Sequence, residues 1–142
     1  MSSTNIHASC VKYSDYGIIF VGKSGVGKSD MCLRFILEHQ AQLVSDDRTN
    51  IRYENGYLVA SAPQNLQGLL EVRGLGIKRV PSIAKQRLHL VVELVKKSSL
   101  VERMPQPEFW NIDGVKVPYI RLCAFEASAP DKVIAALKWH TY

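Results

Sequence analysis

Short apolar segments separated by polar and glycine-containing turns make up most of the chain, and they predict more strands than helices. The Ile-Ile-Phe-Val segment at residues 18–21 is apolar throughout, as expected of a strand that is buried on both faces. Asn55-Gly56 supplies the two positive φ angles that a tight hairpin turn requires. The expected strands lie at residues 5–12, 18–21, from 43, 51–54, 57–60, 69–73 and 87–95.

Only two segments have helical periodicity. Residues 28–40 place Cys32, Phe35 and Ile36 on one face, which predicts an amphipathic helix. The segment from Pro130 to His140 predicts a second helix that Ser128 caps. Between the last strand and this helix, residues 98–111 read as a loop. Because strands outnumber helices without regular alternation, we expect an α/β fold in which a mixed, strand-rich sheet surrounds one central helix, rather than a doubly wound sheet.

Composition limits the class of protein. The 142 residues are 46% hydrophobic and 22% charged, as in one soluble domain. The longest apolar run has five residues against about 20 for a bilayer span, and no signal peptide is visible, so we expect no membrane association. Three widely spaced cysteines predict reduced thiols in a cytoplasmic protein. The net charge of +5 comes from scattered basic residues without interleaved aromatics, so nucleic-acid binding is not expected.

One motif carries specific chemistry. The pattern G-x-x-x-x-G-K-[ST] is satisfied in full by Gly22, Lys23, Ser24, Gly25, Val26, Gly27, Lys28 and Ser29. The glycines allow successive backbone N–H groups to point at phosphate oxygens, and the helix that follows adds its positive dipole end. Lys28 would contact the terminal phosphates of ATP, and the Ser29 hydroxyl would bind Mg²⁺. The alternative is a glycine-rich turn that begins a helix and binds nothing.

Two adjacent aspartates follow the next apolar strand. Asp46 and Asp47 come after Leu43-Val44, where phosphoryl transfer needs a carboxylate near the metal or the attacking group. Adjacent side chains in an extended segment point to opposite faces, so only one of the two is expected squarely in the site. The alternative is a plain turn, which aspartate also favours.

These motifs give the chain a resemblance to the catalytic domain of HPr kinase/phosphorylase. Four motifs match in order: Asn-Ile-His-Ala around His7, the phosphate loop, Leu-Val-Ser-Asp-Asp-Arg at 43–48, and Leu-Glu-Val-Arg-Gly-Leu-Gly-Ile at 70–77. The match is strong over roughly residues 5–80. It implies a kinase fold like that of phosphoenolpyruvate carboxykinase, with ATP and Mg²⁺ as cofactors.

The resemblance also implies roles for individual residues. Glu71 would bind Mg²⁺ together with Ser29. Asp46 would be the general base toward a serine hydroxyl, Lys28 would stabilise the transferring phosphoryl group, and His7 would orient the acidic pair. Asp47, Arg73 and Arg121 would occupy supporting positions. The reverse assignment of Asp46 and Asp47 stays open.

The chain departs from the family in two ways. The phosphate loop begins at residue 22, so we expect residues 1–142 to form a single kinase domain without the amino-terminal regulatory domain of full-length members. The family's P-G-R-N segment, linked to the dephosphorylating reaction, is replaced by Val-Pro-Tyr-Ile-Arg at 117–121, where Arg121 is the candidate substitute. Residual phosphorylase activity and a homo-oligomer, a hexamer in relatives, are further expectations.

The leading hypothesis is therefore an ATP- and Mg²⁺-dependent protein-serine kinase whose partner is HPr or an HPr-like phosphocarrier. A small-molecule kinase could use the same loop, although nothing after Gly76 specifies an acceptor pocket. A non-enzymatic ATP sensor is the third hypothesis. Retention of Lys28, Asp46 and Glu71 argues against it, because a mere binder could lose the base without penalty.

Overall fold

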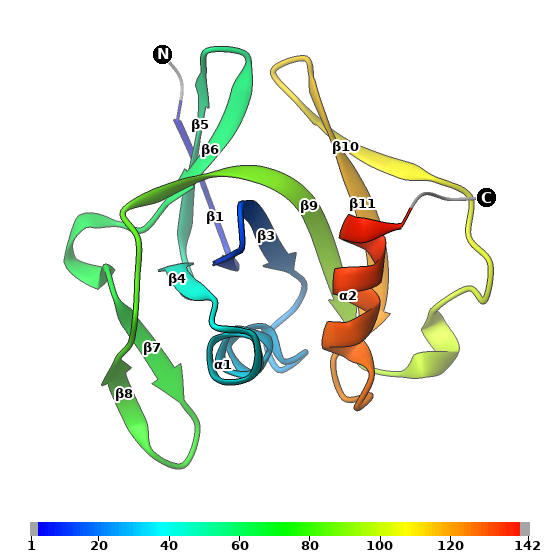
Figure 1. The fold of residues 1–142 in the computed structure, drawn as a ribbon, viewed down its shortest axis with the longest axis horizontal. Coiled ribbons are helices and arrows are strands. Elements are labelled where there is room, and N and C mark those ends of the chain that lie inside the picture. The colour runs from blue at the N-terminus through cyan, green and yellow to red at the C-terminus, as the bar shows by residue number, and fades with distance from the viewer. Residues whose placement is uncertain (1–2, 140–142) are drawn as a thin grey trace.

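The computed structural model describes residues 3–139 and contains two α-helices among strands and two short 3₁₀ helices (Figure 1). In chain order the elements are β1 (Ser3–Ile6), β2 (Ala8–Tyr13), β3 (Tyr16–Val21), α1 (Lys28–His39), β4 (Gln42–Ser45), β5 (Thr49–Glu54), β6 (Tyr57–Ser61), η1 (Gln64–Leu66), β7 (Leu69–Val72), β8 (Gly76–Arg79), β9 (Lys85–Val95), η2 (Ser98–Leu100), β10 (Glu108–Ile112), β11 (Val115–Cys123) and α2 (Ala129–Lys138).

A mixed sheet of nine strands organises the fold. Its main path runs β1-β5-β6-β9-β3-β2-β4, and β11 pairs with β9 and with β10. The long strand β9 is central, because it lies parallel to both β3 and β11 and antiparallel to β6. Figure 1 shows β9 curving across the molecule, with the separate β7–β8 hairpin projecting on the side opposite α2.

Each face of this sheet has its own hydrophobic core. One core joins Phe20 of β3 and Leu90 of β9 to Phe35 of α1 and Val133 of α2. The other core, on the opposite face, includes Ile19 of β3 and residues of β5, β6 and β11. Strand β3 is therefore buried on both faces, which confirms what its uninterrupted apolar sequence predicts. The strand-rich, mixed α/β fold is confirmed as well.

Several boundaries differ from the predicted ones. The strand expected at 5–12 is divided at His7 into β1 and β2. The loop expected at 98–111 ends earlier, because β10 begins at Glu108 and pairs with β11. Ser128 does occupy the position before α2, but its side chain makes no capping hydrogen bond. The helix ends at Lys138, and His140, which we expected to end the helical segment, lies outside the described residues.

Two further expectations concern cysteines and the membrane. Each of the three cysteines is free and buried, in agreement with the reduced thiols that their spacing predicts. Burial raises the pKa of Cys10 and Cys32, so both thiols stay protonated. Neither helix in the described part of the chain has the length and apolar character needed to cross a bilayer.

Candidate functional site: a glycine-rich loop beside two aspartates

The loop between β3 and α1 has a backbone that only glycine can supply at two positions. Gly22 has a φ of 142°, and a Cβ there would lie 2.7 Å from the Leu94 carbonyl oxygen of the neighbouring strand. Gly27, at φ 96°, takes the left-handed conformation immediately before α1, and a Cβ on it would lie 3.0 Å from the Ala124 Cβ. The loop therefore curls tightly in front of the helix, whose first-turn amides have no partner within the helix.

Lys28 is folded back onto this loop. The residue is only 7% exposed, and its Nζ donates hydrogen bonds to the carbonyl oxygens of Gly22 (2.8 Å) and Lys23 (2.9 Å). Burial lowers the pKa of Lys28, while the charges of Asp47 and Asp46 act to raise it. The ammonium group thus lies on the loop, where the charges of the two aspartates favour its protonated form.

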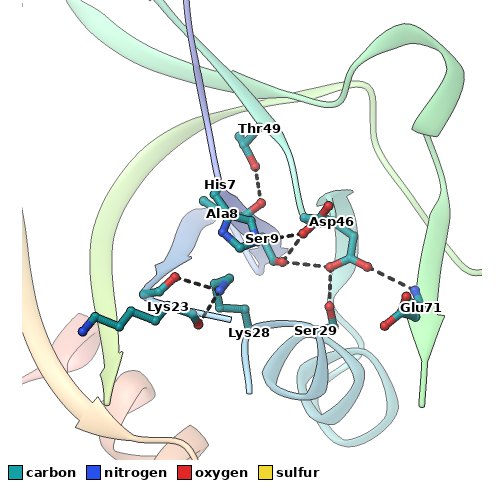
Figure 2. Close-up of polar contacts among 11 residues, drawn as sticks. His7, Ala8, Ser9, Lys23, Lys28, Ser29, Asp46, Thr49 and Glu71 are labelled. Atoms are coloured by element: carbon teal, nitrogen blue, oxygen red, sulfur yellow. Dashed lines mark hydrogen bonds and ion pairs between the residues drawn. The ribbon is translucent and has the colours of Figure 1, made fainter. Parts of the chain in front are cut away.

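Asp46, at the end of β4, is the centre of a buried hydrogen-bond network. Its Oδ1 accepts from Ser9 Oγ (2.8 Å) and from Ser29 Oγ (2.6 Å), and its Oδ2 accepts from the Glu71 backbone N–H (3.1 Å). Figure 2 shows these contacts running from Ser9 through Asp46 to Ser29 and Glu71. Asp46 is 7% exposed, and its carboxylate joins β2, the start of α1 and β7 at one point.

Asp47 is placed differently by a left-handed backbone. Its φ is 67°, which turns the side chain away from the buried network and leaves it 70% exposed. Oδ1 lies 2.8 Å from His7 Nε2, across the bend between β1 and β2. The turn is fixed from both sides, because the Asp47 amide donates to Ser9 Oγ (3.2 Å) and its carbonyl accepts from the Ala8 amide (3.1 Å).

Most of these groups border one cavity of about 510 Å³. Its walls include His7, Lys28, Ser29, Asp47, Glu71 and Arg73 from the predicted set, together with Ser9 and Phe125. Asp46 does not line it. The structure therefore separates the two aspartates: Asp47 lines the cavity, and the buried Asp46 hydrogen-bonds to the residues around it.

The residues that border the cavity have the ligand chemistry that a magnesium ion would need. Mg²⁺ in phosphoryl-transfer sites is held by one or two carboxylates plus substrate oxygens and water, not by an all-protein cage. Within residues 3–139, no group of three or more His, Cys, Asp or Glu side chains could hold a metal by itself. The Ser29 hydroxyl and the Glu71 carboxylate border the same cavity and are oxygen donors of the kind Mg²⁺ prefers.

Arg121, the remaining predicted site residue, lies away from this cavity. It is on β11, where Nε donates to Glu93 at 2.9 Å and Nη1 lies 3.4 Å from Glu108, and it does not line the cavity. Tyr119 also donates to Glu93; burial and this contact raise the pKa of Tyr119 to about 12. Burial acts to raise the pKa of Glu93, but the bonds from Tyr119 and Arg121 outweigh it and lower that pKa. The structure thus does not bring Arg121 to the predicted site.

Ser9 is a site residue that the sequence analysis missed. It is fully buried and contacts both aspartates, by donating to the carboxylate of Asp46 and accepting from the amide of Asp47. A serine inside an apolar strand, two residues after His7, was the available signal, since a buried hydroxyl needs a partner.

Comparisons with known proteins point to one family. The HPr serine kinase C-terminal domain matches residues 1–140. The HPr kinase/phosphorylase of Peptoclostridium acidaminophilum is 33% identical over 124 residues, or 84% of this chain and 39% of the relative. That of Clostridium tetani (strain Massachusetts / E88) is 42% identical over 80 residues, or 56% of this chain and 26% of the relative.

The fold comparison covers nearly the whole chain. The solved structure of the Hpr(Ser) kinase/phosphatase from Coxiella burnetii superposes with a TM-score of 0.81 at 26% identity, over 94% of this chain and 93% of that chain. The chain spans about a quarter to two fifths of the length of the two curated relatives. With its glycine-rich loop, its paired aspartates and a match over residues 1–140, the chain belongs to the HPr serine kinase C-terminal domain family.

Proposed function

We propose that the protein is a protein-serine kinase that transfers the terminal phosphoryl group of ATP to a seryl hydroxyl of HPr or an HPr-like phosphocarrier. The observation that carries the proposal is the common cavity, which is bordered by a phosphate-type loop, Lys28 and an exposed carboxylate paired with His7. Family membership supports HPr as the acceptor, and the curated relatives are HPr kinase/phosphorylases. The likeness of the fold to phosphoenolpyruvate carboxykinase stays a prediction.

In the proposed reaction the loop amides and Lys28 hold the triphosphate, and Mg²⁺ held by Ser29 and Glu71 would neutralise charge on its oxygens. Asp47 takes the proton from the seryl hydroxyl as the seryl oxygen bonds to the terminal phosphorus. The bond from that phosphorus to the bridging oxygen breaks, and ADP leaves. The exposure of Asp47 supports this role, since a base must approach the incoming hydroxyl.

His7 and Asp46 would then be positioning residues. His7 holds one oxygen of Asp47 at 2.8 Å and so orients the other toward the acceptor. Asp46 fixes the Ser29 hydroxyl at 2.6 Å and the Glu71 backbone at 3.1 Å, the two residues proposed to hold the metal. This reverses the expected order of the aspartates, because the buried Asp46 already accepts three hydrogen bonds.

The test is phosphotransfer from γ-labelled ATP to a purified HPr in the presence of Mg²⁺. We expect Lys28→Ala to lower the rate at least about 10³-fold, and Asp47→Asn about 10²- to 10⁴-fold. Asp113→Asn is the matched control, since Asp113 is also an exposed turn aspartate with a positive φ of 52° but lies in the β10–β11 turn. Asparagine tolerates this conformation, so both substitutions leave the backbone in place.

Each alternative has its own outcome in this assay. If Asp47→Asn transfers phosphate as fast as the wild type, the assignment of the base is wrong. Labelling of free metabolites with none of HPr indicates a small-molecule kinase, and tight ATP binding without transfer to any phosphocarrier indicates a sensor.

Phosphoserine-HPr with inorganic phosphate in place of ATP tests the reverse reaction. Light scattering of the purified protein tests the proposed homo-oligomer.

A further inference from the structure

Phe125 is an exposed aromatic side chain at the rim of the cavity. It follows the end of β11 in the 124–128 connection to α2, and it is 62% exposed although it lines the same cavity as the glycine-rich loop. Its Cε1 lies 3.6 Å from the position that a Cβ on Gly27 would occupy. Because the phenyl ring is mostly exposed and borders the cavity, its surface is accessible to a ligand bound there.

The sheet order places Phe125 at the end of the cavity away from the aspartates. The strands run β4-β2-β3-β9, with β11 beyond β9, and the glycine-rich loop follows β3 between these two sides. In Figure 1, β4 and β7 lie on one side of α1 and β11 lies on the other. Of the cavity residues, His7 precedes β2, Asp47 follows β4 and Glu71 is on β7, whereas Phe125 follows β11. A triphosphate that points its terminal phosphate at Asp47 therefore directs its nucleoside toward Phe125.

Arg34 of α1 holds the Phe125 connection rigidly. Its Nη1 donates to the Ala124 carbonyl oxygen at 2.6 Å, and its Nη2 donates to those of Glu126 (3.0 Å) and Ala127 (3.1 Å). The carbonyls on both sides of Phe125 are thus tied to the helix that begins at the phosphate loop. A surface fixed in this way loses little conformational entropy when a ligand binds.

We propose that Phe125 is the stacking surface for the purine base of the nucleotide and that Arg34 is the positioning residue for it. This inference rests on the proposed ATP binding and extends it to the base end of the ligand. An aromatic face accepts any base, so recognition here depends on stacking and not on base-specific hydrogen bonds.

The test compares MgATP with magnesium tripolyphosphate, which has the phosphates without the nucleoside, by calorimetry. We expect Phe125→Ala to weaken ATP binding about tenfold and to leave tripolyphosphate binding unchanged. Phe125→Tyr, which keeps the ring, should bind ATP like the wild type. Phe109→Ala is the matched control, because Phe109 is 54% exposed but lies on β10 away from the cavity.

A double-mutant cycle tests Arg34. Arg34→Lys keeps the charge but loses the forked contacts, and it should weaken ATP binding in the wild type yet add nothing in the Phe125→Ala background. An equal loss in both backgrounds would show that Arg34 does not act through Phe125.

The inference is overturned if Phe125→Ala binds ATP like the wild type, or if it weakens both ligands equally. It is also overturned if the wild type binds ATP no better than tripolyphosphate, whereas a wild type that binds neither ligand contradicts the proposed function itself.

Discussion

Ser9 connects the two aspartates of the site, and its removal should be unusually costly for an alanine substitution that changes so little volume. The side chain is fully buried. Its hydroxyl donates to Asp46 Oδ1 at 2.8 Å and accepts from the Asp47 amide at 3.2 Å. Ser9→Ala therefore removes a donor from a buried carboxylate and leaves a backbone N–H without its acceptor.

The magnitude follows from these two contacts. A hydrogen bond to a charged acceptor contributes about 1.5–3 kcal/mol, and a buried polar group left unpaired costs about 1–3 kcal/mol. Asp46 keeps its contacts with Ser29 and Glu71, which limits the loss. We expect the free energy of unfolding to fall by about 3 kcal/mol, or the Tm by roughly 10 °C.

Urea denaturation monitored by circular dichroism measures this change. Ser98→Ala is the matched control, because the Ser98 hydroxyl also donates to a carboxylate, that of Glu126, but at an exposed position. It should change stability by less than about 0.5 kcal/mol. Equal effects of the two substitutions would refute the argument that burial makes the Ser9 contacts strong.

Two further predictions concern the neighbouring strands. Because the folded-state pKa of Glu93 is lowered by Tyr119 and Arg121, its ionised form stabilises the protein above the unfolded-state pKa, and this stabilisation is lost as the pH falls through the folded-state pKa. Glu93→Gln should therefore cost about 1 kcal/mol at pH 7, and the difference should shrink in acid; a difference independent of pH from urea titrations would contradict this. Gly22→Ala places a Cβ 2.7 Å from the Leu94 carbonyl oxygen at a positive φ. We therefore expect the free energy of unfolding to fall by about 2 kcal/mol or more, and MgATP binding measured by calorimetry to be much weaker. Wild-type stability and affinity in this variant would show that the loop accommodates a side chain.

The parts of the site that are local in sequence could be predicted. The glycine-rich loop and the start of α1 at Lys28 are encoded in eight consecutive residues, and the preceding strand is apolar throughout. The hairpin turn at Asn55-Gly56 likewise follows from two residues with positive φ, which the structure confirms. In each case a short-range conformational requirement determines the outcome, so no distant contact is needed.

The parts that depend on distant contacts could not be predicted from local pattern. Alternation along a strand indicates that Asp46 and Asp47 diverge, but not which one is buried, because that depends on the left-handed φ of Asp47 and on Ser9, 37 residues before Asp46. The strand β10 was missed because Pro105 and Pro107 favour a loop, and its pairing with β11 forms only in the folded sheet.

Asp46 couples the positions of three separate segments of the site. Its three hydrogen-bond donors come from β2, from the first turn of α1 and from β7, which are brought together only in the fold. A shift of any one donor changes where the carboxylate can lie, and with it the Ser29 hydroxyl and the Glu71 backbone at the cavity. Because Ser9 contacts Asp47 as well, a change at this buried strand position is transmitted both to the residues proposed to hold the metal and to the proposed base. In the proposed function the loop amides bind the phosphates, whereas the alignment of the Ser29 hydroxyl with the carboxylates of Asp47 and Glu71 on the cavity wall depends on Asp46.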